Sequence, residues 1–191
     1  MLQLDSREFN KEVFADYVNN GLDSYFGIVD SIAELFQYLG EMEKYEHKGI
    51  NRVLAGYTKE WISKRNKNEY DWIEGDNKWK WNSTNINWIS KENSRNEIGC
   101  IHAIQGIDLN YVGVIVANDL KVGENERLYA DKDEYKDRNG KFTKNDFDQI
   151  GFTDYIKNIY YVLLTRGISG IRVYFENKDF EKYFKKFMGI I

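Results

Sequence analysis

Short apolar segments that few polar residues interrupt constrain this chain more than any other feature. They are "YFGIV" (25–29), "RVLAGY" (52–57), residues 98–104 and 112–117, and "IRVYF" (171–175). Between them lie segments with apolar residues at helical spacing, at 32–39, 153–166 and 178–188. Strands that are apolar throughout are buried on both faces, as in parallel sheets covered by helices. The sequence therefore predicts the α/β class, with a mainly parallel sheet flanked by helices.

The expected helix ends follow from local sequence. Ser31 and Glu34 have the spacing of a capping box, and Thr153 or Asp154 is expected to cap the helix over 153–166. Gly167 stands where a left-handed C-terminal residue belongs. A further helix is expected near the N-terminus, with an apolar face over residues 9–22.

Composition excludes several classes of protein. The chain has 191 residues, which favours one domain with a core over about 25–188, and 42% hydrophobic residues are too many for disorder. Its one cysteine, Cys100, excludes an internal disulfide and a multi-cysteine zinc site, and we expect it to be a small core residue. Apolar runs are far shorter than the roughly 20 residues that span a membrane, and no secretion signal is visible. We therefore expect a soluble cytoplasmic protein with no membrane partner. A net charge of −4 argues against a surface coated in positive charge, though not against one basic groove.

Residues 58–97 break the regular pattern, because all five tryptophans lie there among lysines, asparagines and serines. One interpretation is that tryptophans stack on the bases of a single nucleic-acid strand while nearby lysines and arginines contact its phosphates. The candidates for stacking are Trp72, Trp79, Trp81 and Trp88. The alternative is aromatic packing of this excursion onto the sheet, and it stays open because acidic residues are nearly as numerous as basic ones. Trp61 directly follows a strand and is expected to be structural.

Residues 121–150 are rich in charged residues and poor in aliphatic ones. This composition predicts a solvated, partly mobile insertion between the strand at 112–117 and the helix at 153–166.

The segment "IGCIHAIQGIDLNYVGVIVANDL" (98–120) places a break between two apolar strands. In open α/β sheets, ligands bind beyond the carboxyl ends of strands, and Gln105 and Gly106 follow the first of these strands. Gly106 permits close approach of an anion to a helix start, and Asp108 can accept hydrogen bonds from ribose hydroxyls. The structural alternative makes His102 an interior histidine, Gly106 a turn residue and Asp108 a surface cap.

The segment "YYVLLTRGISGIRVYF" (160–175) ends a helix at Thr165-Arg166-Gly167. An arginine in the last turn is favourable against the helix dipole, which is its structural explanation. It can equally reach a phosphate bound outside the domain, as an arginine finger does.

Together these two segments resemble the fifth and sixth conserved motifs of superfamily 1 helicases. With "RVLAGYTKEW" (52–61), they look like the Schlafen group 3-like DNA/RNA helicase domain family, over about Tyr25 to Phe184. The resemblance implies a RecA-like domain of the P-loop NTPase type. It further implies that Arg166 contacts the γ-phosphate of ATP and that Gln105, Gly106 and Asp108 line the nucleotide. His102, with Gln105, would couple the nucleotide to nucleic acid, and Thr165 belongs to the same helix motif. Arg7 matches a further nucleotide-sensing arginine only loosely.

The chain departs from such enzymes in one respect. It contains no Walker A loop, G-x-x-x-x-G-K-[ST], which cradles phosphates and places magnesium. We therefore expect the second RecA-like domain of an ATP-dependent helicase or translocase, truncated from its first half. ATP and Mg²⁺ would bind only with an N-terminal Walker A-containing domain, and single-stranded DNA or RNA would be the other partner. The alternative is a non-catalytic protein- or RNA-interaction module that keeps the fold.

Overall fold

The computed structural model of the chain describes residues 24–45, 49–137 and 148–191. A seven-stranded sheet dominates it, in the order β1-β9-β6-β2-β5-β4-β3, and every pairing is parallel except the edge pair β3–β4. The strands are β1 (Phe26–Val29), β2 (Asn51–Ala55), β3 (Trp72–Glu74), β4 (Asn77–Trp81), β5 (Glu97–Cys100), β6 (Leu109–Val116) and β9 (Gly167–Phe175). The predicted α/β class with a mainly parallel sheet is confirmed, and the arrangement is compatible with a RecA-like fold.

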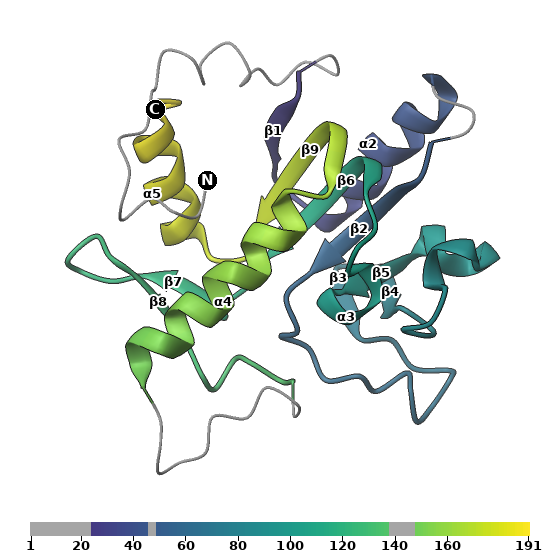
Figure 1. The fold of residues 1–191 in the computed structure, drawn as a ribbon, viewed down its shortest axis with the longest axis horizontal. Coiled ribbons are helices and arrows are strands. Elements are labelled where there is room, and N and C mark those ends of the chain that lie inside the picture. The colour runs from purple at the N-terminus through teal and green to yellow at the C-terminus, as the bar shows by residue number, and fades with distance from the viewer. Residues whose placement is uncertain (1–23, 46–48, 138–147) are drawn as a thin grey trace.

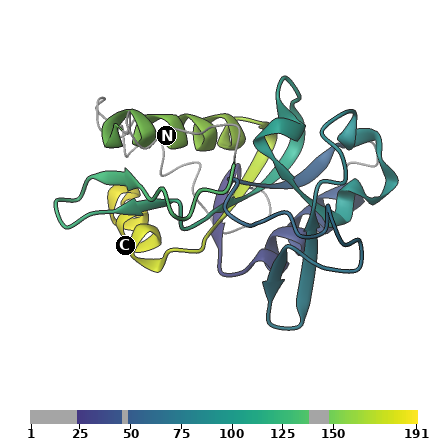
Figure 2. The same cartoon turned by 90° about the horizontal axis from the view of Figure 1, so that it is seen from below.

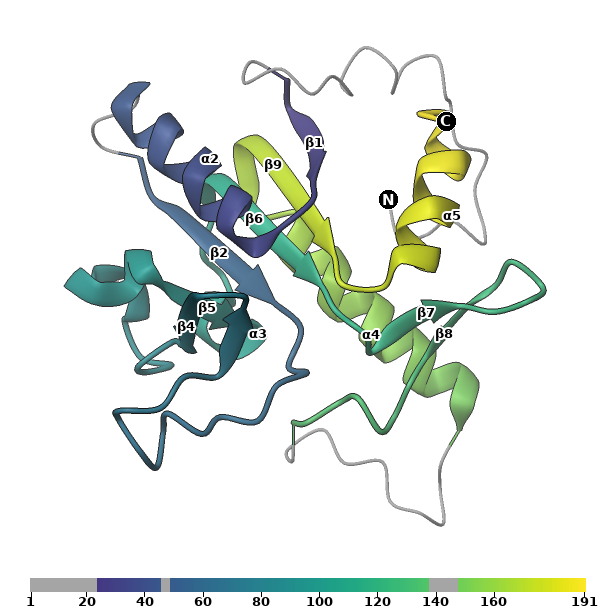
Figure 3. The ribbon, with the colours of Figure 1, turned by 180° about the vertical axis from the view of Figure 1, so that it is seen from behind.

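Helices cover both faces of this sheet. The helix α2 (Ile32–Tyr45) packs on one face, and α4 (Gln149–Leu164) lies across the other, as Figures 1, 2 and 3 show. The short hairpin of β7 (Leu120–Val122) and β8 (Leu128–Ala130) lies beside α4 and α5 (Lys178–Met188) (Figure 1). The strands β2, β6 and β9 are buried over most of their length, because both faces are covered.

The helix α2 begins as the sequence predicts. The backbone N–H of Glu34 donates to Ser31 Oγ at 3.1 Å, while the Glu34 carboxylate accepts from the Asp30 N–H. A distant residue completes the cap, since the Glu74 carboxylate of β3 accepts from the N–H groups of Ile32 and Ala33. A carboxylate at this position also complements the positive end of the helix dipole.

The start of α4 was predicted wrongly. The helix begins at Gln149, with Asp148 as its N-cap accepting from the N–H groups of Ile150 and Gly151. Thr153 lies one turn inside, where its hydroxyl donates to Gln149 O and accepts from Ala130 N–H. Gly167 is not a left-handed cap but the first residue of β9; a side chain there would collide with Gly170 O at 2.6 Å.

The expected strand 98–104 ends at Cys100, and residues Ile101–Ile104 form a single helical turn, α3. Cys100 is fully buried, as predicted. From α3 the chain returns along the face that carries α4 and starts β6 at Leu109. The connection therefore runs from the carboxyl end of β5 to the amino end of β6, which are opposite edges of the sheet.

The tryptophan segment forms the β3–β4 end of the sheet and two 3₁₀ turns, η1 (Trp88–Ser90) and η2 (Glu92–Asn96). Trp72, Trp81 and Trp88 are at most 2% exposed, and Trp79 is half-buried against Phe36 with 5.3 Å between ring centroids. Their role as base-stacking residues is therefore wrong for the three buried rings and disfavoured for Trp79. These side chains supply apolar area that a short edge strand otherwise lacks, which is the packing alternative.

The polar insertion is only partly as expected. Leu120, Leu128 and Ala130 are buried, so β7 and β8 belong to the packed structure. Of the segment 121–150 that was predicted to be partly mobile, residues 138–147 lie outside the described residues, as do Arg7 and the N-terminal helix expected over 9–22.

The packing of Trp88 gives a test of this core. A Cβ added at Gly99 would lie 2.5 Å from Trp88 Cη2 and 2.9 Å from Leu54 Cδ2. We expect Gly99→Ala to lower the free energy of unfolding by roughly 1–3 kcal/mol, because the core is overpacked. Gly40→Ala is the control: nothing lies within 4 Å of a Cβ there, on the exposed face of α2. It should raise stability by up to about 1 kcal/mol. Equal effects of both substitutions in urea unfolding would contradict the described packing.

Candidate functional site

The two motif segments meet at the amino ends of β6 and β9. Leu109 N–H donates to Arg166 O at 2.8 Å, and Leu109 pairs with Gly167 in the sheet. Arg166 Nη1 lies 3.2 Å from Asp108 Oδ1, so the two candidate residues form an ion pair. Residues 58 positions apart in the sequence are thus neighbours because their strands pair in parallel.

The Arg166 side chain is held by the end of its own helix. Its Nε–H donates to Val162 O at 3.1 Å, and Nη2 is 3.5 Å from the Thr165 hydroxyl. The Thr165 hydroxyl itself donates to the carbonyls of Tyr161 and Val162. The helix-capping role and the finger role are therefore compatible, since the bond from Nε fixes the plane of the guanidinium and leaves its outer edge toward Asp108.

Gln105 and Gly106 lie on the turn that leads from α3 to Asp108, and both are exposed. Gly106 has φ +73°, a conformation that L side chains rarely adopt, so the turn after α3 requires glycine. The expectation that these residues lie beyond a carboxyl strand end and at a helix start is wrong. They follow the end of α3, on the connection that leads from the carboxyl end of β5 to the amino end of β6.

His102 lies on the same connection but at its start. Its Nε2 is 2.6 Å from Oδ2 of Asp137, a carboxylate that is 8% exposed. The Tyr135 hydroxyl is 3.4 Å from the same oxygen and 3.2 Å from the Tyr155 hydroxyl of α4. Burial and these neighbours raise the pKa of Tyr135 above its usual range. His102 is therefore separated from the Arg166 group by the length of the connection.

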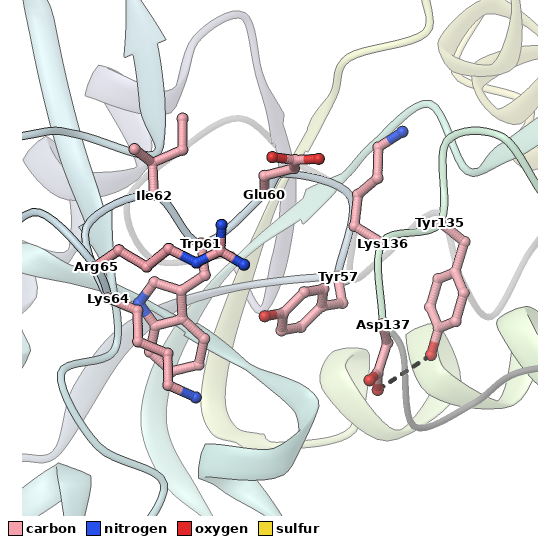
Figure 4. Close-up of a pocket in the computed structure, with 9 residues that line it drawn as sticks. All are labelled: Tyr57, Glu60, Trp61, Ile62, Lys64, Arg65, Tyr135, Lys136 and Asp137. Carbon is pink, nitrogen blue, oxygen red and sulfur yellow. Dashed lines mark hydrogen bonds between the residues drawn. The ribbon is translucent and has the colours of Figure 1, made fainter.

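A pocket of about 630 Å³ opens beside Asp137. Figure 4 shows Trp61, Lys64 and Arg65 on one side of it, Tyr135, Lys136 and Asp137 on the other, and Tyr57 between them. Glu60 and Ile62 complete the lining. The sequence reasoning missed this pocket and expected Trp61 to be structural. The signal was present, since "GYTKEWISKR" places aromatic and basic residues directly after a buried strand.

The sequence reasoning also missed a carboxylate that lies shortly after the carboxyl end of β6. Asp119 is completely buried, and its Oδ1 accepts from the Tyr160 hydroxyl at 2.5 Å. Its Oδ2 has no hydrogen-bond partner among the residues that the structure describes. The Tyr160 hydroxyl in turn accepts from Ala117 N–H at 3.0 Å. Gly56 is required beside them, because a Cβ there would lie 2.5 Å from the Tyr160 hydroxyl oxygen. Burial raises the pKa of Asp119 to about 7 and raises that of Tyr160 well above its usual value.

The described residues are 24–45, 49–137 and 148–191. Among these residues no group of three or more histidine, cysteine, aspartate and glutamate side chains is placed to hold a metal ion. Nor does this part of the chain contain a helix with the length and apolar character needed to cross a membrane.

Comparison with known proteins identifies the family. The model of the Schlafen group 3, DNA/RNA helicase domain matches residues 6–177. The chain belongs to this family. It is also 36% identical over 93 residues to the uncharacterized protein YPL245W of Saccharomyces cerevisiae, an alignment that covers 46% of this chain and 20% of that protein. The chain thus spans about a fifth of the length of this relative. No solved structure matches it.

The buried Asp119 predicts an unusual dependence of stability on pH. Its pKa is about 7 in the folded protein against 3.8 for an unperturbed group, so the folded state binds a proton that the unfolded state has lost. The contribution of Asp119 to the free energy of unfolding is therefore most favourable below pH 4 and is lost as pH rises toward 7. As pH rises from 5 to 8, we expect ionisation of this residue to lower the free energy of unfolding by roughly 2 kcal/mol.

Urea unfolding of the Asp119→Asn variant at both pH values measures this effect. Asparagine keeps an acceptor for Tyr160 and cannot ionise, so the stability difference between pH 5 and 8 should shrink. Asp131→Asn is the control, because a hydrogen bond from Lys121 lowers the pKa of Asp131. Its contribution is lost only below pH 4, and the difference between pH 5 and 8 should be unchanged. A variant at Asp119 that keeps the wild-type pH dependence would contradict the assignment.

Proposed function

We propose that this chain forms the second RecA-like domain of an ATP-dependent DNA or RNA helicase or translocase. The observation that carries the proposal is the ion pair of Arg166 with Asp108 at the edge of the sheet where β6 and β9 begin. Gln105 and Gly106 precede Asp108 on the same turn. The family to which the chain belongs is named for a DNA/RNA helicase domain. A first domain with a Walker A loop would bind ATP and Mg²⁺ and face this edge.

The residues at this edge fit a nucleotide phosphate. Gln105 and Gly106 are exposed, and nothing lies within 4 Å of a Cβ built at Gly106. The side chain of Asp108 is 64% exposed, so its ion pair with Arg166 is worth only about 0–1 kcal/mol. Exchange of Asp108 for a more highly charged phosphate oxygen therefore costs little.

In this mechanism the guanidinium acts as an arginine finger. Its Nε stays bound to Val162 O, and the outer nitrogens turn from Asp108 toward the γ-phosphate. The planar fork of arginine can donate to two phosphate oxygens and stabilise charge as the phosphoryl group transfers. Released from Arg166, Asp108 becomes free to accept hydrogen bonds from the ribose.

The first test is Arg166→Ala in the intact protein, with the Walker A-containing domain present. Loss of the finger should cut ATP turnover by roughly 10³-fold or more while nucleotide affinity falls much less. Arg166→Lys should recover little, because an ammonium group does not reproduce the fork. Steady-state ATPase assays at saturating nucleic acid measure the effect.

Arg95→Ala is the matched control, since Arg95 is an exposed arginine with a similar ion pair, 3.3 Å from Glu43. It should leave turnover unchanged. Thermal melts establish that each variant is folded. Near-wild-type turnover in folded Arg166→Ala protein would reduce Arg166 to a helix cap and favour a non-catalytic interaction module.

A second test uses the 191-residue chain alone. Because it lacks a Walker A loop and its magnesium-binding hydroxyl, it should bind ATP weakly or not at all and hydrolyse none. Phosphate release should stay at the background rate with Mg²⁺ and oligonucleotide present. Magnesium-dependent turnover that Arg166→Ala abolishes would show that this chain carries a complete site.

A further inference from the structure

We propose that the pocket beside Trp61 binds single-stranded nucleic acid, with Trp61 as the stacking surface and Lys64 and Arg65 as phosphate contacts. The class of occupant rests on the proposed function, and the position of the site rests on the geometry of the pocket. The site takes the place of the four tryptophans that were the candidates for stacking, three of which are buried.

Trp61 differs from the other tryptophans because it is half-buried and lines the pocket. Tyr57 lies beside it, with 6.3 Å between ring centroids, and is itself stacked on Trp81 at 5.4 Å. Trp81 makes an edge contact with Trp72 at 5.0 Å inside the core. A continuous row of rings therefore leads from the core to the pocket, so a base that stacks on Trp61 meets a surface that is already in place.

Two cations stand next to this ring. Lys64 Nζ is 5.0 Å from the Trp61 ring centroid, and Arg65 points across the same side of the pocket (Figure 4). Within the described residues neither side chain has a carboxylate within 4.0 Å, and both are exposed. Unpaired cations beside an accessible aromatic ring match the phosphate and the base of one nucleotide unit.

The turn that carries these cations is fixed from below. Ser63 is buried, its N–H and hydroxyl donate to Asp71 at 2.9 and 2.5 Å, and Asp71 also accepts from Trp81 N–H. The N–H of Arg65 donates to Ile62 O and closes the turn. The backbone of the site is therefore ordered before any ligand binds, which lowers the entropic cost of binding.

The opposite wall supports the same occupant. Lys136 N–H donates to Tyr57 O at 2.8 Å and joins the two walls of the pocket. The carboxylate of Asp137 contacts His102. The charges in the lining are three cations, Lys64, Arg65 and Lys136, against Glu60 and the buried Asp137. An acidic peptide would be attracted by the same cations, but it offers no planar base to a tryptophan. The combination of ring and cations therefore favours nucleic acid.

The test uses the 191-residue chain with fluorescein-labelled dT and rU oligonucleotides of roughly 12 nucleotides, which separate DNA from RNA. Fluorescence anisotropy should show binding at low salt to at least one of them. Trp61→Ala should weaken it roughly 5- to 150-fold, as for loss of one base–aromatic stack. Trp79→Ala removes another half-buried tryptophan, outside the pocket, and should leave affinity within about twofold once melts establish folding.

The second measurement uses substitutions of exposed side chains, which leave the packing of the core unchanged. The double variant Lys64→Ala and Arg65→Ala should reduce the slope of log affinity against log salt by roughly 1.4, since each phosphate contact contributes about 0.7 on a single strand. The control pair is Lys78→Ala and Lys91→Ala, two exposed lysines outside the pocket lining. It should leave the slope unchanged.

Three results would overturn the inference: no binding at low salt, a double variant with the wild-type slope, or poly-glutamate that binds as tightly as the oligonucleotides and depends equally on Trp61. These assays contain no ATP, so their failure is independent of the turnover of Arg166→Ala. If Trp61 is required for nucleic-acid binding and Arg166→Ala has normal turnover, the proposed binding site stands and the proposed arginine finger is wrong.

Discussion

The parallel pairing of β6 with β9 is the interaction that positions polar groups at both edges of the sheet. It runs from Leu109 opposite Gly167 to Val116 opposite Phe175. At its amino end it places Arg166 beside Asp108, and at its carboxyl end it brings the residues after β6 beside Glu176. Both strands are buried for most of this length, so a shift of register would expose apolar side chains and separate both groups.

The helix α4 connects these two edges. Its Tyr160 donates a hydrogen bond to the buried Asp119, and its Tyr155 is hydrogen-bonded to Tyr135 beside the pocket. The residue after its C-cap is Arg166. A helix is stiff along its axis, and buried polar contacts hold it in one position over the sheet. Displacement of the pocket wall would therefore act on the element that carries Arg166. In the proposed function, α4 is a physical route between the pocket and the Arg166–Asp108 pair.

Periodicity was sufficient for the fold class and for α2 and α5, because an apolar strand or stripe has few ways to be buried. It failed at the ends of elements, which polar contacts and backbone geometry decide. Asp148 rather than Thr153 caps α4, and α3 interrupts an apolar run that reads as a strand, since neither end is decided by local hydrophobicity. Motif spacing located Arg166 and Asp108, whose ion pair the structure adds, but it could not show that His102 instead contacts the buried Asp137.

The tryptophans show why composition alone could not locate a binding surface. Stacking on a base and packing in a core require the same flat apolar ring, and only the neighbours distinguish them. Trp88 fills the space over Gly99 and donates to Glu97, and Trp81 donates to Lys59 O, so both rings have satisfied polar groups inside the protein. Trp61 lies at the end of the row of rings that runs from Trp72 through Trp81 and Tyr57, and it lines the pocket. In the proposed site the buried Trp72 and Trp81 contribute indirectly, because they support the ring on which a base would stack.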